Sequence, residues 1–367
     1  MKNLSPGPED QVFCDTMNVC MTIDRSKIRR VLVRAPNWVG DAIMALPSLE
    51  ALKENLPGSS VVVLAKPWVI PVFENHPCVD SVLHYRKDVP YPRALLRIMS
   101  TASELRRLKF DLAFLLQNAF EAALLAWLAG IPYRLGYNTD GRSLLLSHPV
   151  PKEKDRQGHQ VEYYMGILKS MNWRVEPRDP RLHVNGSKVS AARSLLLSYG
   201  IKRDDFLLGM APGATYGPAK RWPPEKFAAV ADMAAEKWGA KVVVMGSGNE
   251  QTIGDAVVLA MRSPALNLCG KTSLGEAAAV IQQCRAFLTN DSGLMHLAAA
   301  LDVPTVAVFG STDPTATGPR SEKARVVRHP MECSPCLKPE CPEGCPCLKS
   351  IQPDEVWKEL VSCLRST

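Results

Sequence analysis

The sequence predicts an α/β protein made of two doubly wound domains that face a central cleft. The chain has 367 residues, which is long for a single hydrophobic core. Short apolar runs alternate with amphipathic segments in both halves, a pattern typical of parallel sheets with helices on both faces. The segment Arg174–Gly186, rich in Pro, Arg and Asp, separates the two series and is the linker candidate. Ligands of such domains bind at the carboxyl ends of the strands.

In the first half, apolar runs bounded by turn residues predict strands, and apolar residues at helical spacing predict helices between them. The expected strands are Val31–Arg34, Ser60–Ala65, Ser81–His84, Leu112–Gln117 and Tyr133–Gly136. The expected helices are Ile43–Asn55, Val69–Glu74, Ala94–Arg107 and Phe120–Ala129. Pro47 would cost about 3 kcal/mol in a helix interior, so Gly40–Leu46 is expected to form a separate short turn before a helix that begins near Pro47.

In the second half the same two signals return after the linker. The expected strands are Phe206–Ala211, Lys241–Met245, Ala286–Thr289 and Thr305–Phe309. The expected helices are Ala191–Tyr199, Pro224–Lys237, Gly248–Met261, Leu274–Cys284, Met295–Leu301 and a final amphipathic helix, Pro353–Leu364. Pro224 stands at a first helical position, where proline is well tolerated.

Composition and charge exclude several classes of protein. The hydrophobic fraction of 46% and the charged fraction of 22% are those of an ordinary soluble globular protein. The net charge of +7 is a mild excess of base. Basic residues cluster in Arg25–Arg34 and Arg97–Lys109, which either face an anionic partner or form a solvated surface. Neither cluster has interleaved aromatics, so no nucleic-acid partner is expected.

Targeting and membrane-spanning signals are weak. Residues 1–26 have no apolar stretch behind the first lysine, and they are expected to form a loose leader, not a secretory signal. The most apolar segment, Asp111–Pro132, contains Gln117, Asn118 and Glu121 and falls short of the roughly 20 apolar residues that cross a bilayer. A cytoplasmic protein is expected, and peripheral contact with a membrane is left open.

The cysteines concentrate near the C-terminus. The chain has 11 cysteines, too few for its length to indicate a disulfide scaffold. The Cys-rich segment has the spacing C-x2-C-x4-C-x3-C-x-C and contains Cys333, Cys336, Cys341, Cys345 and Cys347. Four thiolates in one loop could hold zinc or an iron–sulfur cluster, but the segment lacks the separated pairs of common zinc sites. Two interpretations of the Cys-rich segment are therefore kept: a structural metal site, and thiols that are reduced or partly bridged.

Asp41 stands at the turn between the first strand and the first helix, in RAPNWVGDAIMALP. Helix amides at such a turn favour anions, so a ligand's phosphate is the usual occupant. The carboxylate is interpreted either as a helix N-cap or as a general base at the mouth of the cleft. The turn lacks the G-x-G-x-x-G spacing, which argues against a dinucleotide cofactor.

Two stretches of the second half suit an anionic ligand with a sugar. Lys220 and Arg221 follow a Gly-rich strand exit in PGATYGPAKRW, where they could bind phosphate or remain solvated surface bases. The GSG at Gly246–Gly248 permits close approach of the backbone to a ligand, and Glu250 could accept hydrogen bonds from ribose hydroxyls.

A third stretch, LTNDSGLMHLAAA, places small polar residues at the start of a helix. The amides and hydroxyl of Asp291, Ser292 and Gly293 suit a phosphate group. His296 follows on the helix, where a histidine is often a packed core residue. The TDP at Thr312–Pro314 adds to the functional interpretation.

Taken in this order, RAPNWVGD, PGATYGPAKRWP and DSGLMHLA resemble the ADP-heptose:lipopolysaccharide heptosyltransferases of glycosyltransferase family 9, most closely the heptosyltransferase II type. The resemblance covers the chain from about Lys27 to the C-terminus. It implies a GT-B fold of two Rossmann-like domains: residues 27–180 bind the acceptor, and residues 181–350, which include the Cys-rich loop 333–347, bind the nucleotide sugar. Residues 351–367 are expected to form a helix that packs back on the first domain.

The resemblance also implies roles for single residues. Asp41 matches the family's proposed catalytic base, and Lys220 matches a lysine near the donor phosphates and the reactive sugar. The other implied donor-binding residues are Thr215 in the same loop, Glu250 near the ribose, Thr272 and Leu274 near the adenine, and Asp291, Ser292, Gly293 and His296 near the diphosphate. No metal or other cofactor is implied.

The implied reaction moves heptose, with inversion, from ADP-L-glycero-D-manno-heptose to the first heptose of the lipid-anchored lipopolysaccharide inner core. It would take place in the cytoplasm, with peripheral contact at the inner membrane left open. One alternative is a family 9 transferase with another donor or acceptor, such as the heptosyltransferase I type. Another is a non-catalytic nucleotide-sugar-binding protein of envelope assembly, which the joint presence of Asp41, Lys220 and His296 disfavours. A nicotinamide dehydrogenase is disfavoured because the dinucleotide fingerprint is missing.

Overall fold

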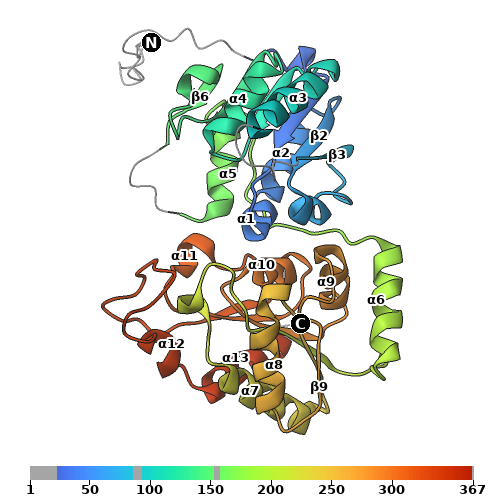
Figure 1. The fold of residues 1–367 in the computed structure, drawn as a ribbon, viewed down its shortest axis with the longest axis vertical. Helices are drawn as coiled ribbons and strands as arrows, with labels where there is room; N and C mark the ends of the chain where they lie inside the picture. The colour runs from blue at the N-terminus through green and yellow to red at the C-terminus, as the bar shows by residue number, and fades with distance from the viewer. Residues whose placement is uncertain (1–22, 86–92, 153–157, 366–367) are drawn as a thin grey trace, which may run out of the picture.

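The expected pair of doubly wound domains is confirmed. The computed structural model describes residues 23–85, 93–152 and 158–365, so most of the expected leader, residues 1–22, lies outside the described residues. Two six-stranded sheets form two domains, one above the other in Figure 1. All pairs between neighbouring strands are parallel.

The first sheet has the strand order β3-β2-β1-β4-β5-β6. Its strands are β1 Arg30–Arg34, β2 Ser60–Ala65, β3 Ser81–His84, β4 Leu112–Leu115, β5 Tyr133–Tyr137 and β6 His148–Val150. Val31 of the central strand β1 pairs with Val61 on one side and Leu112 on the other. Val31 and Val33 pack into one core cluster and Leu32 into another, because successive side chains point to opposite faces that are both covered by helices. The strand order reverses between β1 and β4, which is where such sheets bind ligands.

Helices connect the strands of the first sheet. They are η1 Arg25–Lys27, α1 Val39–Met44, α2 Leu46–Asn55, η2 Pro67–Val72, α3 Arg93–Arg107, α4 Phe120–Leu128, η3 Ser143–Leu145 and α5 Gln160–Lys169. The expected break before Pro47 is confirmed, since α1 ends at Met44 and α2 begins at Leu46. The expected short helix Val69–Glu74 is present as the 3-10 helix η2, which begins and ends two residues earlier and contains Pro71.

The second sheet repeats the pattern with the order β12-β11-β10-β7-β8-β9. Its strands are β7 Leu207–Ala211, β8 Lys241–Val244, β9 Ala265–Asn267, β10 Ala286–Asn290, β11 Thr305–Val308 and β12 Ala324–Val327. Its helices are α6 Gly186–Ser198, η4 Pro218–Lys220, α7 Pro224–Trp238, η5 Gly248–Glu250, α8 Gln251–Ala260, α9 Leu274–Ile281, α10 Gly293–Ala300, α11 Pro314–Thr317, α12 Pro346–Ser350 and α13 Pro353–Arg365. Here the strand order reverses between β7 and β10.

The final helix packs on the second domain, and the expectation that it returns to the first is wrong. Its apolar stripe buries Val356, Leu360 and Cys363 against α7, β11 and β12. The ring centroids of Trp357 and Trp238 lie 4.3 Å apart, which anchors α13 to α7. Residues 353–365 therefore belong to the second domain.

The two domains contact each other directly through α1 and α10. A Cβ added at Gly40 would lie 2.8 Å from Cδ2 of His296, and one added at Gly293 would lie 3.0 Å from Cβ of Val39. Glycine at both positions allows the two helices to approach closely. This contact brings the turn that carries Asp41 next to the start of α10.

Candidate active site

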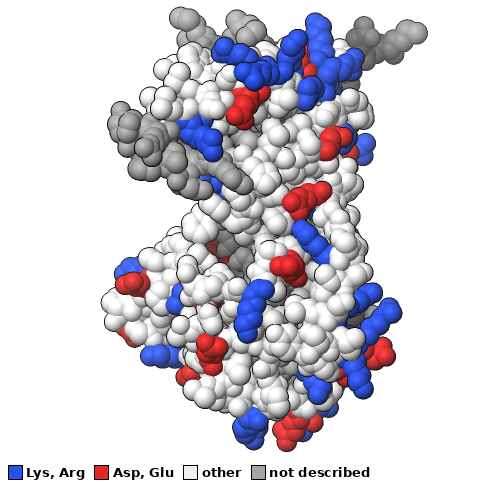
Figure 2. Space-filling view, turned by 45° about the vertical axis from the view of Figure 1, so that its right-hand side comes forward, with Lys and Arg blue, Asp and Glu red and all other residues white. Residues whose placement is uncertain are grey.

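A cavity of about 560 Å³ lies between the two domains, at the carboxyl ends of both sheets. Figure 2 shows that the surface is hollowed between the upper and lower domains. The catalytic and donor-binding residues that the family resemblance implied all line this cavity: Asp41, Thr215, Lys220, Glu250, Thr272, Leu274, Asp291, Ser292, Gly293 and His296. Arg221, the second base considered for a phosphate, is not among the lining residues. The fold therefore gathers stretches that lie far apart in the sequence.

Asp41 lies in the first turn of α1, but it does not cap the helix, because the N-cap residue is Trp38. Its Oδ1 accepts a hydrogen bond from the hydroxyl of Tyr164 at 2.9 Å, and Nε2 of Gln160 lies 3.5 Å from the same oxygen. Both partners come from α5. The capping interpretation of Asp41 is therefore wrong, and the carboxylate is held by side chains at the cavity wall.

Burial raises the pKa of Asp41 above its ordinary value of 3.8. The hydrogen bonds from Tyr164 and Gln160 and the positive charge of Lys220 offset part of this rise, because all three stabilise the ionised form. A carboxylate whose pKa is raised by burial is a better proton acceptor than a solvated one. Asp41 thus has the surroundings of a general base.

Lys220 ends the short helix η4 and reaches across to the end of β10. Its Nζ lies 2.5 Å from Oδ2 of Asp291, and the hydroxyl of Thr312 donates to the same oxygen at 2.6 Å. Nζ also lies 4.7 Å from the ring centroid of Tyr216. The carboxylate of Asp291 therefore holds Lys220 and Thr312 together at one end of the cavity.

The side chain of Asn290, which is buried at the end of β10, holds the loop that carries Lys220. This side chain donates to the carbonyl of Pro212 at 2.6 Å and accepts from the amide of Trp222 at 3.0 Å. Arg221 donates to the carbonyl of Ala214 at 3.1 Å, so its guanidinium closes the loop. Lys220 is thus presented by a rigid turn.

The Cys-rich segment packs against the outer side of the same loop. The amide of Ala219 donates to the carbonyl of Pro339 at 3.0 Å, and the hydroxyl of Tyr216 donates to the carbonyl of Leu337 at 2.6 Å. Gly217 has a φ of +157°, and a Cβ there would lie 2.2 Å from the oxygen of Pro339. In the described part of the chain the cysteines are free thiols, and no group of three or more His, Cys, Asp or Glu side chains is placed to hold a metal ion.

The start of α10 forms the middle of the cavity wall. Ser292 is the N-cap residue, and its hydroxyl accepts from the amide of Met295 at 3.4 Å. His296 is buried one turn later, and burial lowers its pKa to about 4, against the influence of Asp291. Because His296 is therefore neutral near pH 7, the positive potential here comes from the helix N-terminus and from Lys220.

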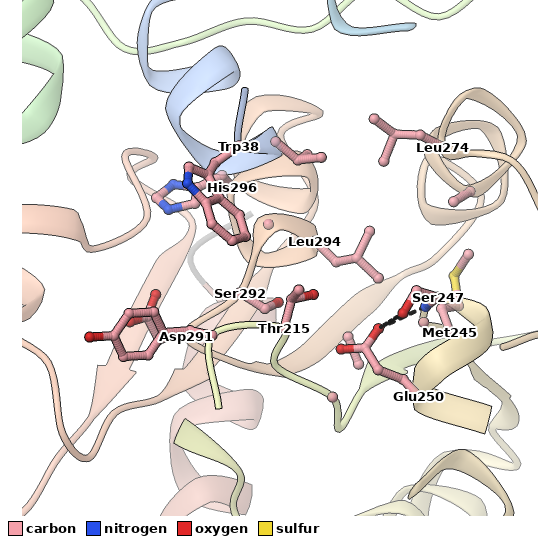
Figure 3. Close-up of a pocket in the computed structure, with 18 of the residues that line it drawn as sticks. Trp38, Thr215, Met245, Ser247, Glu250, Leu274, Asp291, Ser292, Leu294 and His296 are labelled. Carbon is pink, nitrogen blue, oxygen red and sulfur yellow. Dashed lines mark hydrogen bonds between the residues drawn. The ribbon is translucent and has the colours of Figure 1, made fainter. Parts of the chain in front are cut away.

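The far end of the cavity is lined by Glu250, Thr272 and Leu274. In Figure 3, Glu250 and Leu274 lie on the opposite side from Asp291, with Thr215 and Ser292 between them. One oxygen of Glu250 accepts from the amide and the hydroxyl of Ser247, at 2.7 and 2.8 Å. The other oxygen, Oε1, lies against Gly213, where a Cβ would come within 2.2 Å of it. This carboxylate is held in place and keeps acceptor capacity toward the cavity.

Several residues of the site were missed from the sequence. Trp38 and Trp68 line the cavity with exposed fractions of 61% and 49%. Tyr164 and Gln160 were missed because their helix was not predicted, although the apolar spacing at Val161, Tyr164, Met165 and Leu168 is helical. Gly40 was treated only as part of a turn.

Comparisons with known proteins agree with this geometry. The family model described as Glycosyltransferase family 9 (heptosyltransferase) matches residues 98–346 of this chain. The chain is 33% identical over 351 residues to lipopolysaccharide heptosyltransferase 2 of Salmonella typhimurium, covering 91% of this chain and 98% of the relative. It is 32% identical to lipopolysaccharide heptosyltransferase 2 of Escherichia coli, with coverage of 91% and 98%.

Solved structures show the same fold. ADP-heptose lps heptosyltransferase II of Escherichia coli matches with a TM-score of 0.80 at 30% identity, covering 92% of this chain and 99% of that chain. A family 9 glycosyl transferase of Veillonella parvula matches with a TM-score of 0.83 at 24% identity, covering 92% and 98%. The chain therefore belongs to glycosyltransferase family 9, the heptosyltransferases, and has the GT-B fold that its sequence predicted.

Proposed function

We propose that this protein transfers heptose, with inversion, from ADP-L-glycero-D-manno-heptose to the first heptose of the lipopolysaccharide inner core. The observation that carries the proposal is the cavity between the domains, which places Asp41 of the first domain opposite Lys220 and the α10 N-terminus of the second. The likeness to lipopolysaccharide heptosyltransferase 2 of Salmonella typhimurium supports the choice of donor and acceptor.

Glycosyl transfer with inversion needs a base on one face of the anomeric carbon. The acceptor hydroxyl forms the new C–O bond while its proton passes to Asp41, and the bond between the anomeric carbon and the diphosphate oxygen breaks. The raised pKa of Asp41 makes its carboxylate a stronger proton acceptor than a solvated aspartate. Asp41 is the proposed catalytic base.

The departing diphosphate needs positive charge on the opposite face. Lys220 supplies a point charge, and the amides of Ser292 and Gly293 at the start of α10 supply oriented dipoles. Alone, the Asp291 carboxylate would repel a diphosphate. Here the Lys220 ammonium and the Thr312 hydroxyl both bind the Asp291 carboxylate, and the ammonium neutralises its charge. We therefore assign Asp291 to holding Lys220 in place, and Lys220 to stabilising the leaving group.

The nucleoside would extend from the diphosphate toward the other end of the cavity. Thr215 and Ser292 stand at the middle, where Figure 3 shows them between Asp291 and Glu250. Glu250 would accept from the ribose hydroxyls, while Thr272 and Leu274 would contact the adenine. His296, neutral near pH 7, would act through an N–H group and not as a cation.

We also propose peripheral contact with the membrane that carries the acceptor, at its cytoplasmic face. Figure 2 shows Lys and Arg side chains gathered at the top of the first domain. The first basic cluster and the chain segment after the second meet where the backbone amides of Arg29 and Arg30 donate to the Asp111 carboxylate, at 2.8 and 2.9 Å. Each such charge near an anionic bilayer contributes about 1 kcal/mol. No helix in the described ranges has the length and apolar character needed to span a membrane. Sedimentation with anionic and neutral vesicles tests this contact.

Mass spectrometry of the products from a panel of nucleotide sugars and heptose-bearing acceptors tests the proposed reaction. We expect transfer from ADP-heptose to an acceptor that ends in the first inner-core heptose. Transfer to an acceptor without that heptose, at equal or higher rate, would instead favour the heptosyltransferase I type. Binding of ADP-heptose without transfer or hydrolysis would favour a non-catalytic protein.

A further inference from the structure

Helix α5 holds the predicted base from one face. Tyr164 and Gln160 lie four residues apart, so their side chains project from the same side of the helix. Both contact Oδ1 of Asp41, Tyr164 at 2.9 Å and Gln160 at 3.5 Å. These hydrogen bonds leave Oδ2 to take the proton of the acceptor hydroxyl.

The N-terminal end of the same helix contacts the second domain. The cap residue His159 accepts the amide of Val161 at Nδ1, so Nε2 carries the proton that is donated to the carbonyl of Gly318 at 2.8 Å. Oε1 of Glu162 accepts from Arg320 at 2.6 Å. In Figure 1, α5 stands beside α1, and its lower end points to α11 of the second domain.

Tyr164 has little freedom to move. Its side chain is buried, and its ring meets the ring of Tyr163 at a centroid distance of 5.5 Å. Tyr163 in turn stacks on Tyr137 at 4.3 Å. Burial raises the pKa of Tyr164 well above its ordinary value, so the phenol stays protonated and acts as a hydrogen-bond donor to the carboxylate.

We propose that Tyr164 is a positioning residue for Asp41, and that α5 makes this positioning depend on the docking of the second domain at Gly318 and Arg320. The inference rests on the proposed function, because it assigns Asp41 the role of base. When the domains separate, the contacts of His159 and Glu162 are lost, and α5 loses its fixed end. The base is then held correctly only when the donor domain is in place.

The charged and titratable groups around Asp41 define the expected pH effect. Tyr164 faces the carboxylate from α5, Lys220 acts on it from η4, and His296 of α10 packs against the adjacent Gly40. His296 has a pKa of about 4 and stays neutral between pH 5 and 9. Removing the Tyr164 hydroxyl removes a donor that lowers the pKa of Asp41, so the pKa of Asp41 rises.

Tyr164→Phe is the direct test, with Tyr163→Phe as the matched control, because the Tyr163 hydroxyl bonds to Asn118 and not to Asp41. We expect Tyr164→Phe to lower kcat about tenfold, to keep the donor KM within about twofold, and to move the acidic limb of the kcat/KM profile to higher pH. Tyr163→Phe should leave that limb in place. An acidic limb at the wild-type position in a folded Tyr164→Phe protein would overturn the proposal.

The link to the second domain is tested with Glu162→Gln, which breaks the ion pair with Arg320 outside the cavity. Glu54→Gln is its control, because Glu54 pairs with Arg178 at 2.6 Å in a surface site that does not line the cavity. We expect Glu162→Gln to shift the acidic limb in the same direction as Tyr164→Phe, with no further shift in the double variant. A wild-type profile for Glu162→Gln, or fully additive shifts, would overturn the dependence on domain docking.

Asp41→Asn, measured alongside, separates this inference from the proposed function. If Asp41→Asn keeps wild-type turnover, Asp41 is not the base, and both the function of Asp41 and the role of Tyr164 are refuted. If Asp41→Asn is inactive while Tyr164→Phe matches the wild type in rate and pH profile, the positioning role alone is refuted. Tyr164→Phe in the Asp41→Asn background should have no further effect.

Discussion

The ammonium of Lys220 and the carboxylate of Asp291 lie 2.5 Å apart, with side chains only 13% and 6% exposed. The two residues come from different loops of the second domain, one after β7 and one after β10. Their pairing neutralises an acidic group beside the place proposed for a diphosphate. It also explains how the D-S-G motif can carry a carboxylate at a helix start that is proposed to bind an anion.

Lys220→Ala is expected to weaken both the fold and the use of donor. Removal of the ammonium leaves the Asp291 carboxylate buried without its counter-ion, which costs about 3 kcal/mol of unfolding free energy. Chemical unfolding and the donor KM measure the two effects. Adding Asp291→Asn should restore most of the stability without restoring transfer. A single Lys220→Ala variant with wild-type stability and wild-type donor KM would contradict the account.

Gly40→Ala is expected to push α1 away from α10. The added Cβ would lie 2.8 Å from Cδ2 of His296, and buried rings have little room to move. Because Asp41 is the next residue, we expect kcat to fall at least about tenfold. Gly186→Ala is the control, since an added Cβ there meets no heavy atom of the described residues within 4 Å. Equal activities of the two variants in the transfer assay would count against this contact.

The pH dependence of transfer follows from the raised pKa of Asp41. A general base acts in its ionised form, so activity is present above the pKa of Asp41 and is lost as the pH falls through it. Since burial raises that pKa, the acidic limb of kcat/KM is expected above pH 3.8. Initial rates between pH 4 and 9, with circular dichroism to confirm folding, measure the limb. A constant rate down to pH 4 would argue against a buried carboxylate base.

Chelation of divalent metal is expected to leave transfer unchanged. Lys220 and the α10 amides already provide positive potential for the leaving diphosphate. Initial rates with and without EDTA, after removal of bound metal, test this expectation, and metal analysis by plasma mass spectrometry extends it to the Cys-rich segment. If EDTA abolished the activity and Mg²⁺ or Mn²⁺ restored it, Lys220 and the α10 amides would not be sufficient to stabilise the leaving diphosphate.

The sequence predicted most of the fold because buried parallel strands leave a strong local signal. The central strands β1 (RVLVR) and β10 (AFLTN) each contain three consecutive buried apolar residues, and both were predicted to within one residue at each end. The strands β9 and β12 were missed because they are short and only partly buried, so they lack such a run. The packing of α13 could not be predicted. Its amphipathic pattern shows that one face of the helix is buried, but it does not show which domain buries that face.

The predicted site residues came from local motifs, and the missed ones from long-range packing. Asp41, Lys220 and Asp291 lie in the connections that follow β1, β7 and β10, and all three line the cavity. Tyr164 lies on a helix that was not predicted, and its contact with Asp41 joins residues 123 positions apart. No spacing rule reaches across such a distance, which is why the partner of the base emerged only from the structure.

The most direct test of the central claim is the rate of heptose transfer by Asp41→Ala, measured together with its affinity for ADP. The account predicts a loss of transfer of at least about 100-fold, because a general base contributes that much, while calorimetry shows ADP affinity within about twofold of the wild type. Wild-type turnover by this variant would contradict the assignment of Asp41 as the base.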